Sequence, residues 1–155
     1  MVTCTTPPFR AAVRLNSGVR CHGRFILFSI RSSSSDRELA FLSLDGDHFT
    51  VELRGSALQA THAVWAYTDA KGLANLFARL GSYERPWSSE ERWESLEGEF
   101  SLSARCSPLG HVDFSVHLHG SQGAPEEWQL TAVLTTELGQ LPKIAASASG
   151  FFSGT

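Results

Sequence analysis

The chain has 155 residues, a formal net charge of −3, and 42% hydrophobic against 19% charged residues. This composition excludes a disordered or fibrous protein, and the length suits one domain, with or without an appended arm. The longest uncharged apolar run, residues 25–30, is far shorter than the roughly 20 residues that a bilayer crossing requires, so no membrane association is expected. The mild net charge indicates neither a nucleic acid nor an acidic partner.

The cysteines and the N-terminus bear on the cellular compartment. Cys4, Cys21 and Cys106 are widely spaced and form no CxxC pair, so we interpret them as reduced thiols. No secretory signal is visible, because the apolar run at residues 25–30 is too short and too far from the start. We therefore expect a cytoplasmic protein.

Charge is distributed unevenly along the chain. Residues 1–35 contain five arginines and no acidic residue, whereas the remaining residues contain eight basic and sixteen acidic ones. We predict an Arg-rich N-terminal arm over residues 1–35, which forms an extension or edge strands, and a single α+β domain over residues 36–155. A flexible hinge is expected at residues 31–36. Arms of this composition also occur in targeting and nucleic-acid binding, although we do not expect nucleic acid as the partner.

Five segments alternate apolar and polar residues with a period of two, which is the pattern of half-buried strands. Because each has one polar face, we expect antiparallel pairing. His62 falls on the apolar register of the second segment, where we expect a half-buried, hydrogen-bonded histidine. The predicted strands are residues 49–54, 58–67, 100–106, 111–119 and 128–135.

Two segments place apolar residues on one helical stripe. The first predicted helix begins after Asp69 and ends at Gly81, and the second runs from Leu141 to Phe152. The predicted order after the arm is therefore β-β-α-β-β-β-α. The simplest architecture is α+β, with an open antiparallel sheet of about five to seven strands and both helices packed on one face.

Spaced tryptophans and a glycine-histidine pair carry a family resemblance. Residues 87–102, which include Trp87 and Trp93, are followed by Gly110-His111-Val112 and by Trp128. Over residues ~47–152 this pattern resembles a bacterial family called domain of unknown function 6228, although that family commonly has Trp-Gly or Trp-Asp-Gly where this chain has Trp87-Ser88-Ser89. The resemblance implies a shared fold and a bacterial, cytosolic protein, and it implies no activity.

The segment from Glu84 to Glu99 is densely charged, with six glutamates and two arginines around two tryptophans. Carboxylates beside aromatic rings are typical of a glycosidase cleft or of an acidic surface that binds a basic protein. The same pattern also fits a short helix with a solvated charged side and with both tryptophans packed inward. The candidate binding residues are Trp87, Glu90, Glu91, Arg92, Trp93 and Glu94.

A second candidate site lies along one predicted strand. Side chains two residues apart on a strand lie on one face, so His111, Asp113, His117 and His119 are candidate metal ligands. The same alternation is typical of any solvated strand face, which binds no metal unless further groups orient the imidazoles. The metal site therefore stands as an alternative.

The sequence contains no GxxxxGK[ST] or GxGxxG loop, no GxSxG turn and no HExxH helix. No catalytic residue and no cofactor are therefore predicted. We expect a non-catalytic protein-binding domain of the immunity or accessory type, whose acidic Trp/Glu segment binds a protein partner and suits a basic one. The alternative is a metal-dependent enzyme that uses the histidine-rich strand.

Overall fold

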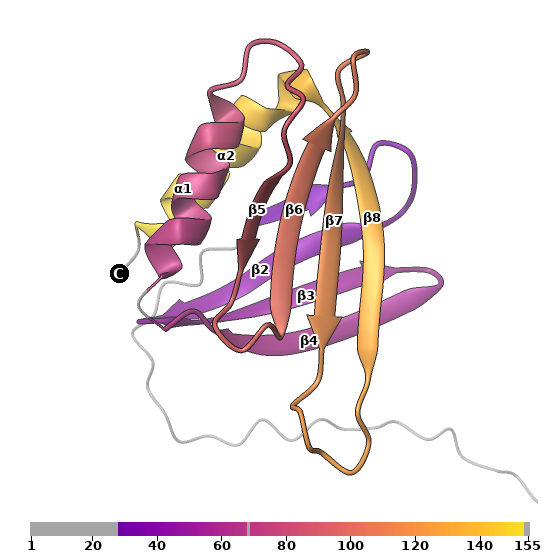
Figure 1. Ribbon diagram of the computed structural model, residues 1–155, viewed down its shortest axis with the longest axis vertical. Helices are drawn as coiled ribbons and strands as arrows, with labels where there is room; N and C mark the ends of the chain where they lie inside the picture. The colour runs from indigo at the N-terminus through magenta and orange to yellow at the C-terminus, as the bar shows by residue number, and fades with distance from the viewer. Residues whose placement is uncertain (1–27, 68, 154–155) are drawn as a thin grey trace, which may run out of the picture.

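The fold combines two four-stranded antiparallel sheets with two helices (Figure 1), as seen in a computed structural model that describes residues 28–67 and 69–153. The first sheet has the order β1 (Phe28–Arg31), β2 (Glu38–Asp45), β3 (His48–Gly55) and β4 (Leu58–Trp65). The second has the order β5 (Glu91–Glu94), β6 (Phe100–Cys106), β7 (His111–His119) and β8 (Gln129–Glu137). Helix α1 (Ala70–Gly81) follows the first sheet, and a 3-10 turn (Leu138–Gln140) and helix α2 (Leu141–Phe152) follow the second.

The chain thus builds the same arrangement twice, a four-stranded meander followed by a helix. Within each sheet, strands that are consecutive in sequence are hydrogen-bonded neighbours. This pattern follows from the short turns between them, because antiparallel strands need no long crossover. Each sheet therefore begins and ends with an edge strand.

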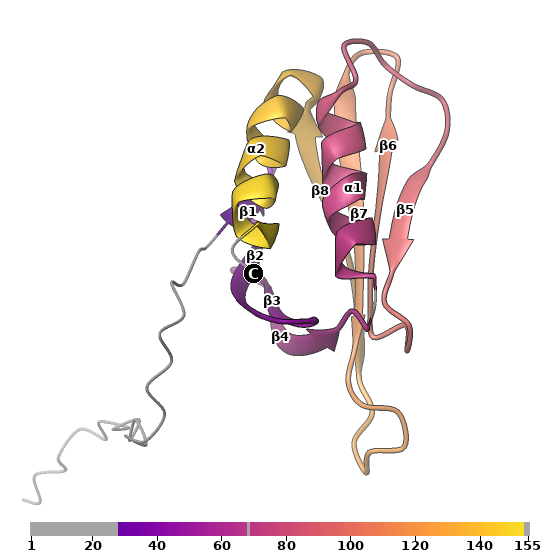
Figure 2. The ribbon, with the colours of Figure 1, turned by 90° about the vertical axis from the view of Figure 1, so that its left-hand side faces the viewer.

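The two helices lie side by side and run in opposite directions on one side of the molecule (Figure 2). Helix α1 lies next to β5, and α2 lies next to β1. A Cβ atom at Gly81 would collide with the Cβ of Ala145 in α2, so the glycine permits the close approach of the helices. Within the described ranges, no helix has the length and apolar character that a membrane crossing needs.

One aromatic cluster joins both sheets and both helices into a single core. At its centre, the Phe41 ring of β2 stacks on Phe28 of β1 at a centroid distance of 4.3 Å. It also meets Phe77 of α1 at 6.0 Å, Phe100 of β6 at 6.1 Å and Phe151 of α2 at 5.9 Å. All five rings are at most 4% exposed, so the two halves fold around shared side chains.

The predicted single open sheet of five to seven strands is wrong, because the strands divide into two sheets. The α+β class, the five predicted strands and both helices are confirmed. The observed order is β-β-β-β-α-β-β-β-β-α: β1 lies in the arm, for which edge strands are one of the two expectations, and the alternation pattern misses β2 and β5. In β2 a register shift between Phe41 and Ser43 interrupts the alternation, and β5 has only four residues, three of them charged.

Part of the predicted arm belongs to the first sheet. Strand β1 pairs with β2 and buries Phe28 and Ile30, while residues 1–27, with Cys4 and Cys21, lie outside the described residues. The predicted hinge is a turn that is bonded to β8. The backbone N–H of Ser33 donates to Thr135 O over 2.7 Å, and Arg37 Nη1 donates to Val133 O over 3.0 Å.

Candidate functional site

The charged segment contains the short strand β5 between loops, and the short helix considered for it is absent. Trp93 is a core residue, 6% exposed, and its Nε1 donates to Asp69 Oδ2 over 2.9 Å. Trp87 is half-buried and stacks on Tyr83 at a centroid distance of 4.4 Å. Both rings therefore pack into the protein, and neither is an exposed anchor.

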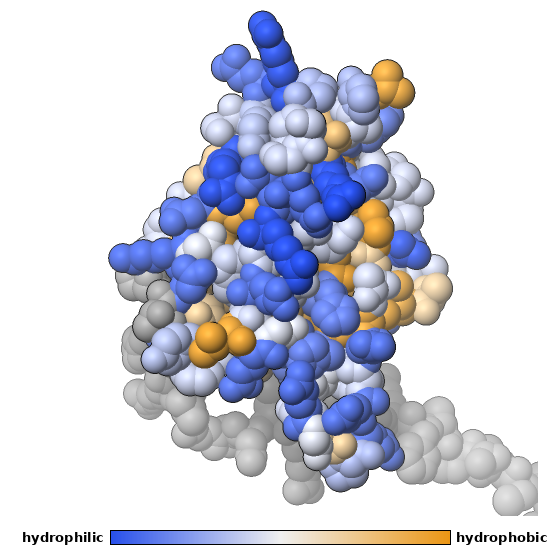
Figure 3. All heavy atoms as spheres, viewed as in Figure 1, coloured by the Kyte–Doolittle hydropathy of each residue, from blue (hydrophilic) through white to orange (hydrophobic). Residues whose placement is uncertain are grey.

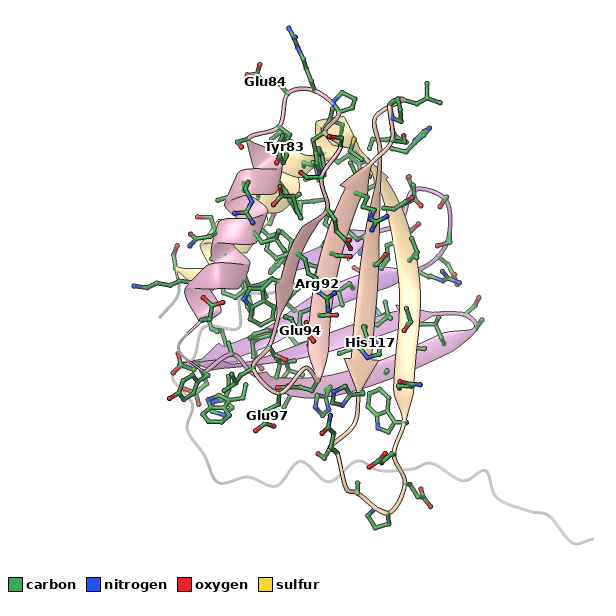
Figure 4. All side chains as sticks on the ribbon, viewed as in Figure 1. Tyr83, Glu84, Arg92, Glu94, Glu97 and His117 are labelled. Atoms are coloured by element: carbon green, nitrogen blue, oxygen red, sulfur yellow. The ribbon has the colours of Figure 1, made fainter. Side chains whose placement is uncertain are left out.

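Each of the three candidate glutamates is paired with an arginine of the same chain. Arg105 Nη2 lies 2.7 Å from Glu90 Oε2, and Arg92 Nη2 lies 2.7 Å from Glu94 Oε2. Figure 4 shows the Arg92 and Glu94 side chains on β5, and Figure 3 shows that this face of the second sheet is mostly hydrophilic. Because its charges are balanced, the predicted patch carries little unpaired negative charge.

Glu91 is the most enclosed of the three, with a side chain 14% exposed. Tyr83 Oη donates to its Oε1 over 2.8 Å, and Arg79 Nε lies 2.6 Å from its Oε2. The hydrogen bond from Tyr83, together with the charge of Arg79, holds the pKa of Glu91 below its ordinary value against the effect of burial. Glu91 thus ties β5 to the end of α1.

The histidine-rich strand is β7, and its candidate ligands fall into two groups. At one end, His111 Nδ1 lies 3.1 Å from Glu137 Oε1, and Asp113 Oδ1 accepts from Thr135 Oγ1 over 2.7 Å. At the other end, His117 and His119 have ring centroids 6.0 Å apart. Within residues 28–67 and 69–153, no three His, Cys, Asp or Glu side chains form a group that could hold a metal ion. A metal site remains a prediction, which elemental analysis of untagged protein would test.

A groove that the sequence did not reveal is lined by β4, by the turn between β5 and β6, and by the end of β7 with the loop after it. Figure 1 shows the end of β7 crossing β4. The larger part of the groove has a volume of ≈ 670 Å³, and a neighbouring hollow of ≈ 390 Å³ shares His119, Gly120 and Gln122 with it. We call the two together the cross-sheet groove. Its main lining residues are His48, His62, Ala63, Trp65, Glu97, Glu99, His119, Gln122, Glu127 and Trp128.

A buried carboxylate fixes the floor of the cross-sheet groove. Glu99 is 6% exposed, and its Oε1 accepts a hydrogen bond from the backbone N–H of Trp65 over 3.1 Å. Its Oε2 accepts from Ser95 Oγ over 2.8 Å. Because Trp65 ends β4 and Glu99 precedes β6, this carboxylate links the two sheets.

Aromatic rings form the walls. His48 stacks on Trp65 with an interplanar angle of 10°, and the His62 ring meets Trp128 edge-on at 6.0 Å. A Cβ at Gly120 would come within 2.5 Å of Trp128 Nε1, so the glycine permits the close approach of the indole to the chain there. The rings are therefore held in place from both sheets.

Among the described residues of the lining, the charged side chains are all acidic: Glu97, Glu99 and Glu127. Figure 4 shows Glu97 projecting beyond the ends of β5 and β6. Trp65 and Trp128 are 37% and 39% exposed. Acidic groups beside exposed indoles favour a cationic side chain, which carboxylates attract and aromatic faces stabilise.

Of the lining residues, His119 is a candidate site residue in the sequence, where its spacing on the strand assigns it to the metal site. The other lining residues come from several strands and turns, so no local spacing joins them. His62 is half-buried, as its register predicts, but its ring has no hydrogen-bond partner among the described residues and contacts Trp128 instead. One signal in the sequence points to the groove: Trp65 is a large aromatic ring at a position of the alternating segment where a polar, solvent-facing residue is expected.

Comparison with curated proteins gives no match. A family model described as a family of unknown function, DUF6228, matches residues 22–155. The match extends beyond the predicted ~47–152 and takes in β1 and β2, in agreement with their place in the shared core. The chain belongs to the DUF6228 family.

Proposed function

We propose that this protein is a non-catalytic protein-binding domain of the immunity or accessory type, and that it binds a basic segment of a partner protein in the cross-sheet groove. The proposal rests on one observation: the described lining of the groove combines charged side chains that are all acidic with exposed tryptophans. Aromatic residues are enriched where partners anchor, and complementary charge steers encounter.

The distribution of unpaired carboxylates favours the groove over the binding surface that the sequence predicts around Glu90, Glu91 and Glu94. Glu90, Glu91 and Glu94 are each paired with an arginine. Glu97 is exposed and has no hydrogen-bond or ion-pair partner in the described part of the chain, and Glu127 bonds only the backbone N–H of Gly123. The charged segment thus contributes to binding through Glu97 at its end.

Calorimetric titration with a peptide of about eight residues that alternates arginine and valine tests the proposal. We expect binding at low salt that weakens as salt screens the charges, and no binding of the same peptide with glutamate in place of arginine. The double variant Glu97→Gln, Glu127→Gln should bind the basic peptide about tenfold more weakly.

A matched control removes two exposed carboxylates elsewhere. Glu84 lies at the opposite end of β5 from the groove (Figure 4), and Glu137 lies at the opposite end of β8 from Trp128. The variant Glu84→Gln, Glu137→Gln changes the net charge equally and should keep the affinity. Equal weakening by both double variants would show general charge attraction and would contradict a site in the groove.

A further inference from the structure

We infer that the partner's basic segment binds as an additional β-strand on the free edge of β4, an inference that rests on the proposed function. Strand β4 is the last strand of the first sheet and forms its lower border in Figure 1. Its residues His62, Ala63 and Trp65 line the cross-sheet groove. The edge and the groove are therefore parts of one surface.

The hydrogen bonds at the end of β4 show which backbone groups point outward. The N–H of Ala66 donates to Asp47 O on the β3 side, whereas the N–H of Trp65 points away from β3 and donates to Glu99. Because successive residues of a strand alternate in direction, the N–H and C=O groups of Gln59, Thr61 and Ala63 also point away from β3. In the described part of the chain these groups have no partner, and all three residues are exposed.

The other three sheet edges are shorter than β4 or are partly bonded to another segment. The turn that contains Ser33 and Arg37 donates hydrogen bonds to the edge of β8. Strand β5 lies against α1, and β1 lies against α2. Strands β1 and β5 have only four residues each, whereas β4 runs for eight, and in the described part of the chain no hydrogen bond from another segment reaches its outer groups from Gln59 to Ala63.

Strand β4 also lacks the residues that normally protect an edge. Its sequence LQATHAVW contains no charged residue, proline or glycine. Native edge strands usually carry a charge, a proline or a bulge, because an unprotected edge pairs with other extended chains. An unprotected strand beside a groove is the arrangement used in strand addition, where the backbone gives affinity and alternate side chains give specificity.

The charge of the cross-sheet groove determines which kind of chain is favoured at the edge of β4. An added strand would place its side chains alternately toward the two faces of the sheet, one of which bears His62 and the neighbouring Trp128. Glu97 and Glu127 lie in the same groove, so arginine or lysine side chains of the added strand are stabilised. A second copy of this chain would instead bring the same carboxylates together, which is unfavourable.

N-methylated peptides test the binding mode on the intact protein. Two versions of the arginine-valine peptide carry N-methyl groups either on every arginine or on every valine, so that each blocks one of the two sets of amides. A strand on β4 donates from only one set, so we expect one version to lose about tenfold in affinity and the other to bind like the unmodified peptide. Equal affinities of the two versions would overturn strand addition.

A variant pair tests the same bonds from the side of the protein. Thr61→Pro removes one outward N–H and places a ring on the edge, a position at which a sheet tolerates proline. Thr61→Ala removes the side chain but keeps the N–H. We expect loss of peptide binding in Thr61→Pro and full binding in Thr61→Ala. Urea unfolding confirms that both variants fold. Equal binding by the two variants would overturn the inference, and the test with methylated peptides holds even if Thr61→Pro does not fold.

The outcomes separate the two proposals. If the unmodified basic peptide does not bind, the proposed function fails and the inference fails with it. If it binds with no difference between the methylated versions, the groove binds basic segments by side chains alone, and only strand addition is overturned. A dimer in sedimentation that Thr61→Pro dissociates and Thr61→Ala preserves would identify a second copy as the occupant and would also overturn it.

Discussion

The backbone N–H of Trp65 and the carboxylate of Glu99, 34 residues apart in sequence, are joined by a hydrogen bond of 3.1 Å. This bond connects the end of the first sheet to the start of the second at the base of the cross-sheet groove. Ser95 Oγ bonds the other carboxylate oxygen and also accepts from the N–H of Phe100. The geometry of the groove therefore depends on one buried side chain.

We expect Glu99→Ala to lower the free energy of unfolding by about 2 kcal/mol, because the Trp65 N–H and the Ser95 hydroxyl lose their acceptor. Glu99→Gln retains a carbonyl oxygen that can accept one of the two bonds, so its effect should be smaller. Urea unfolding of both variants measures the difference. Equal losses would show that the charge of the carboxylate matters more than its hydrogen bonds.

The sequence pattern predicts local structure well here because the alternating strands have one buried face. Where that condition fails, so does the prediction. In β2, Leu39, Ala40 and Phe41 are consecutively buried, and a register shift follows between Phe41 and Ser43. Division into two sheets depends on packing around Phe41 by side chains from distant segments, and periodicity contains no information about such contacts.

The site was harder to predict for a related reason. Charged and aromatic residues clustered in sequence, from Trp87 to Glu94, are used for packing and internal ion pairs. The groove instead combines residues such as His62 and Trp128, which lie 66 positions apart and meet because the two sheets cross. Local density of chemical groups is thus a poor guide when nonlocal strand ends form the surface.

Trp93 and Trp128 are expected to respond oppositely to truncation. Trp93→Ala removes a buried ring that lies 6.2 Å from Phe49 and 6.1 Å from Phe100, and should destabilise the fold by about 3–5 kcal/mol. Trp128 is 39% exposed, so Trp128→Ala should cost about 1 kcal/mol or less while weakening peptide binding. Urea unfolding and calorimetry distinguish the two roles. A stable Trp93→Ala would contradict a core position for that ring.

An ion-pair network on the first sheet predicts a pH dependence of stability. Burial by itself would raise the pKa of Glu38, but hydrogen bonds from Ser29, Arg31 and Arg54 outweigh it and lower the pKa from 4.5 to about 2. The charged form is therefore favoured in the folded state. Its contribution is present above about pH 4.5 and is lost as the pH falls toward 2.

The shift of the Glu38 pKa from 4.5 to about 2 corresponds to a contribution of no more than about 3 kcal/mol to the free energy of unfolding. Solvent screening of the exposed Arg31 and Arg54 reduces this contribution. Glu38→Gln should thus be less stable than the parent at pH 7 and should differ little from it near pH 2. Denaturant unfolding across this range measures the gap. Glu84→Gln, at an exposed position, is the control. A difference in the free energy of unfolding between Glu38→Gln and the parent that stays constant with pH would argue against the ion pairs.

Strand β1 is expected to be essential although most of the N-terminal arm precedes it. From the alternation pattern alone, removal of residues 1–35 should leave a folded domain with little loss of stability. The structure places Phe28 and Ile30 in the core, 4% and 0% exposed, with Phe28 stacked on Phe41 and in contact with Phe151 of α2. Removal of β1 would expose Phe41 and the edge of β2, so we expect a truncation at residue 35 to unfold or aggregate.

Point substitutions in the full chain separate the loss of β1 packing from the loss of the residues before it. Ile30→Ala should lower the free energy of unfolding by about 2–4 kcal/mol, because the side chain is fully buried. Arg31→Ala, at an exposed position of the same strand, removes one ion pair to Glu38 and should cost about 1 kcal/mol or less. Urea unfolding compares the two. If Ile30→Ala is as stable as Arg31→Ala, β1 does not contribute to the core in solution, and the boundary of the folded domain lies after residue 35 as the sequence pattern predicts.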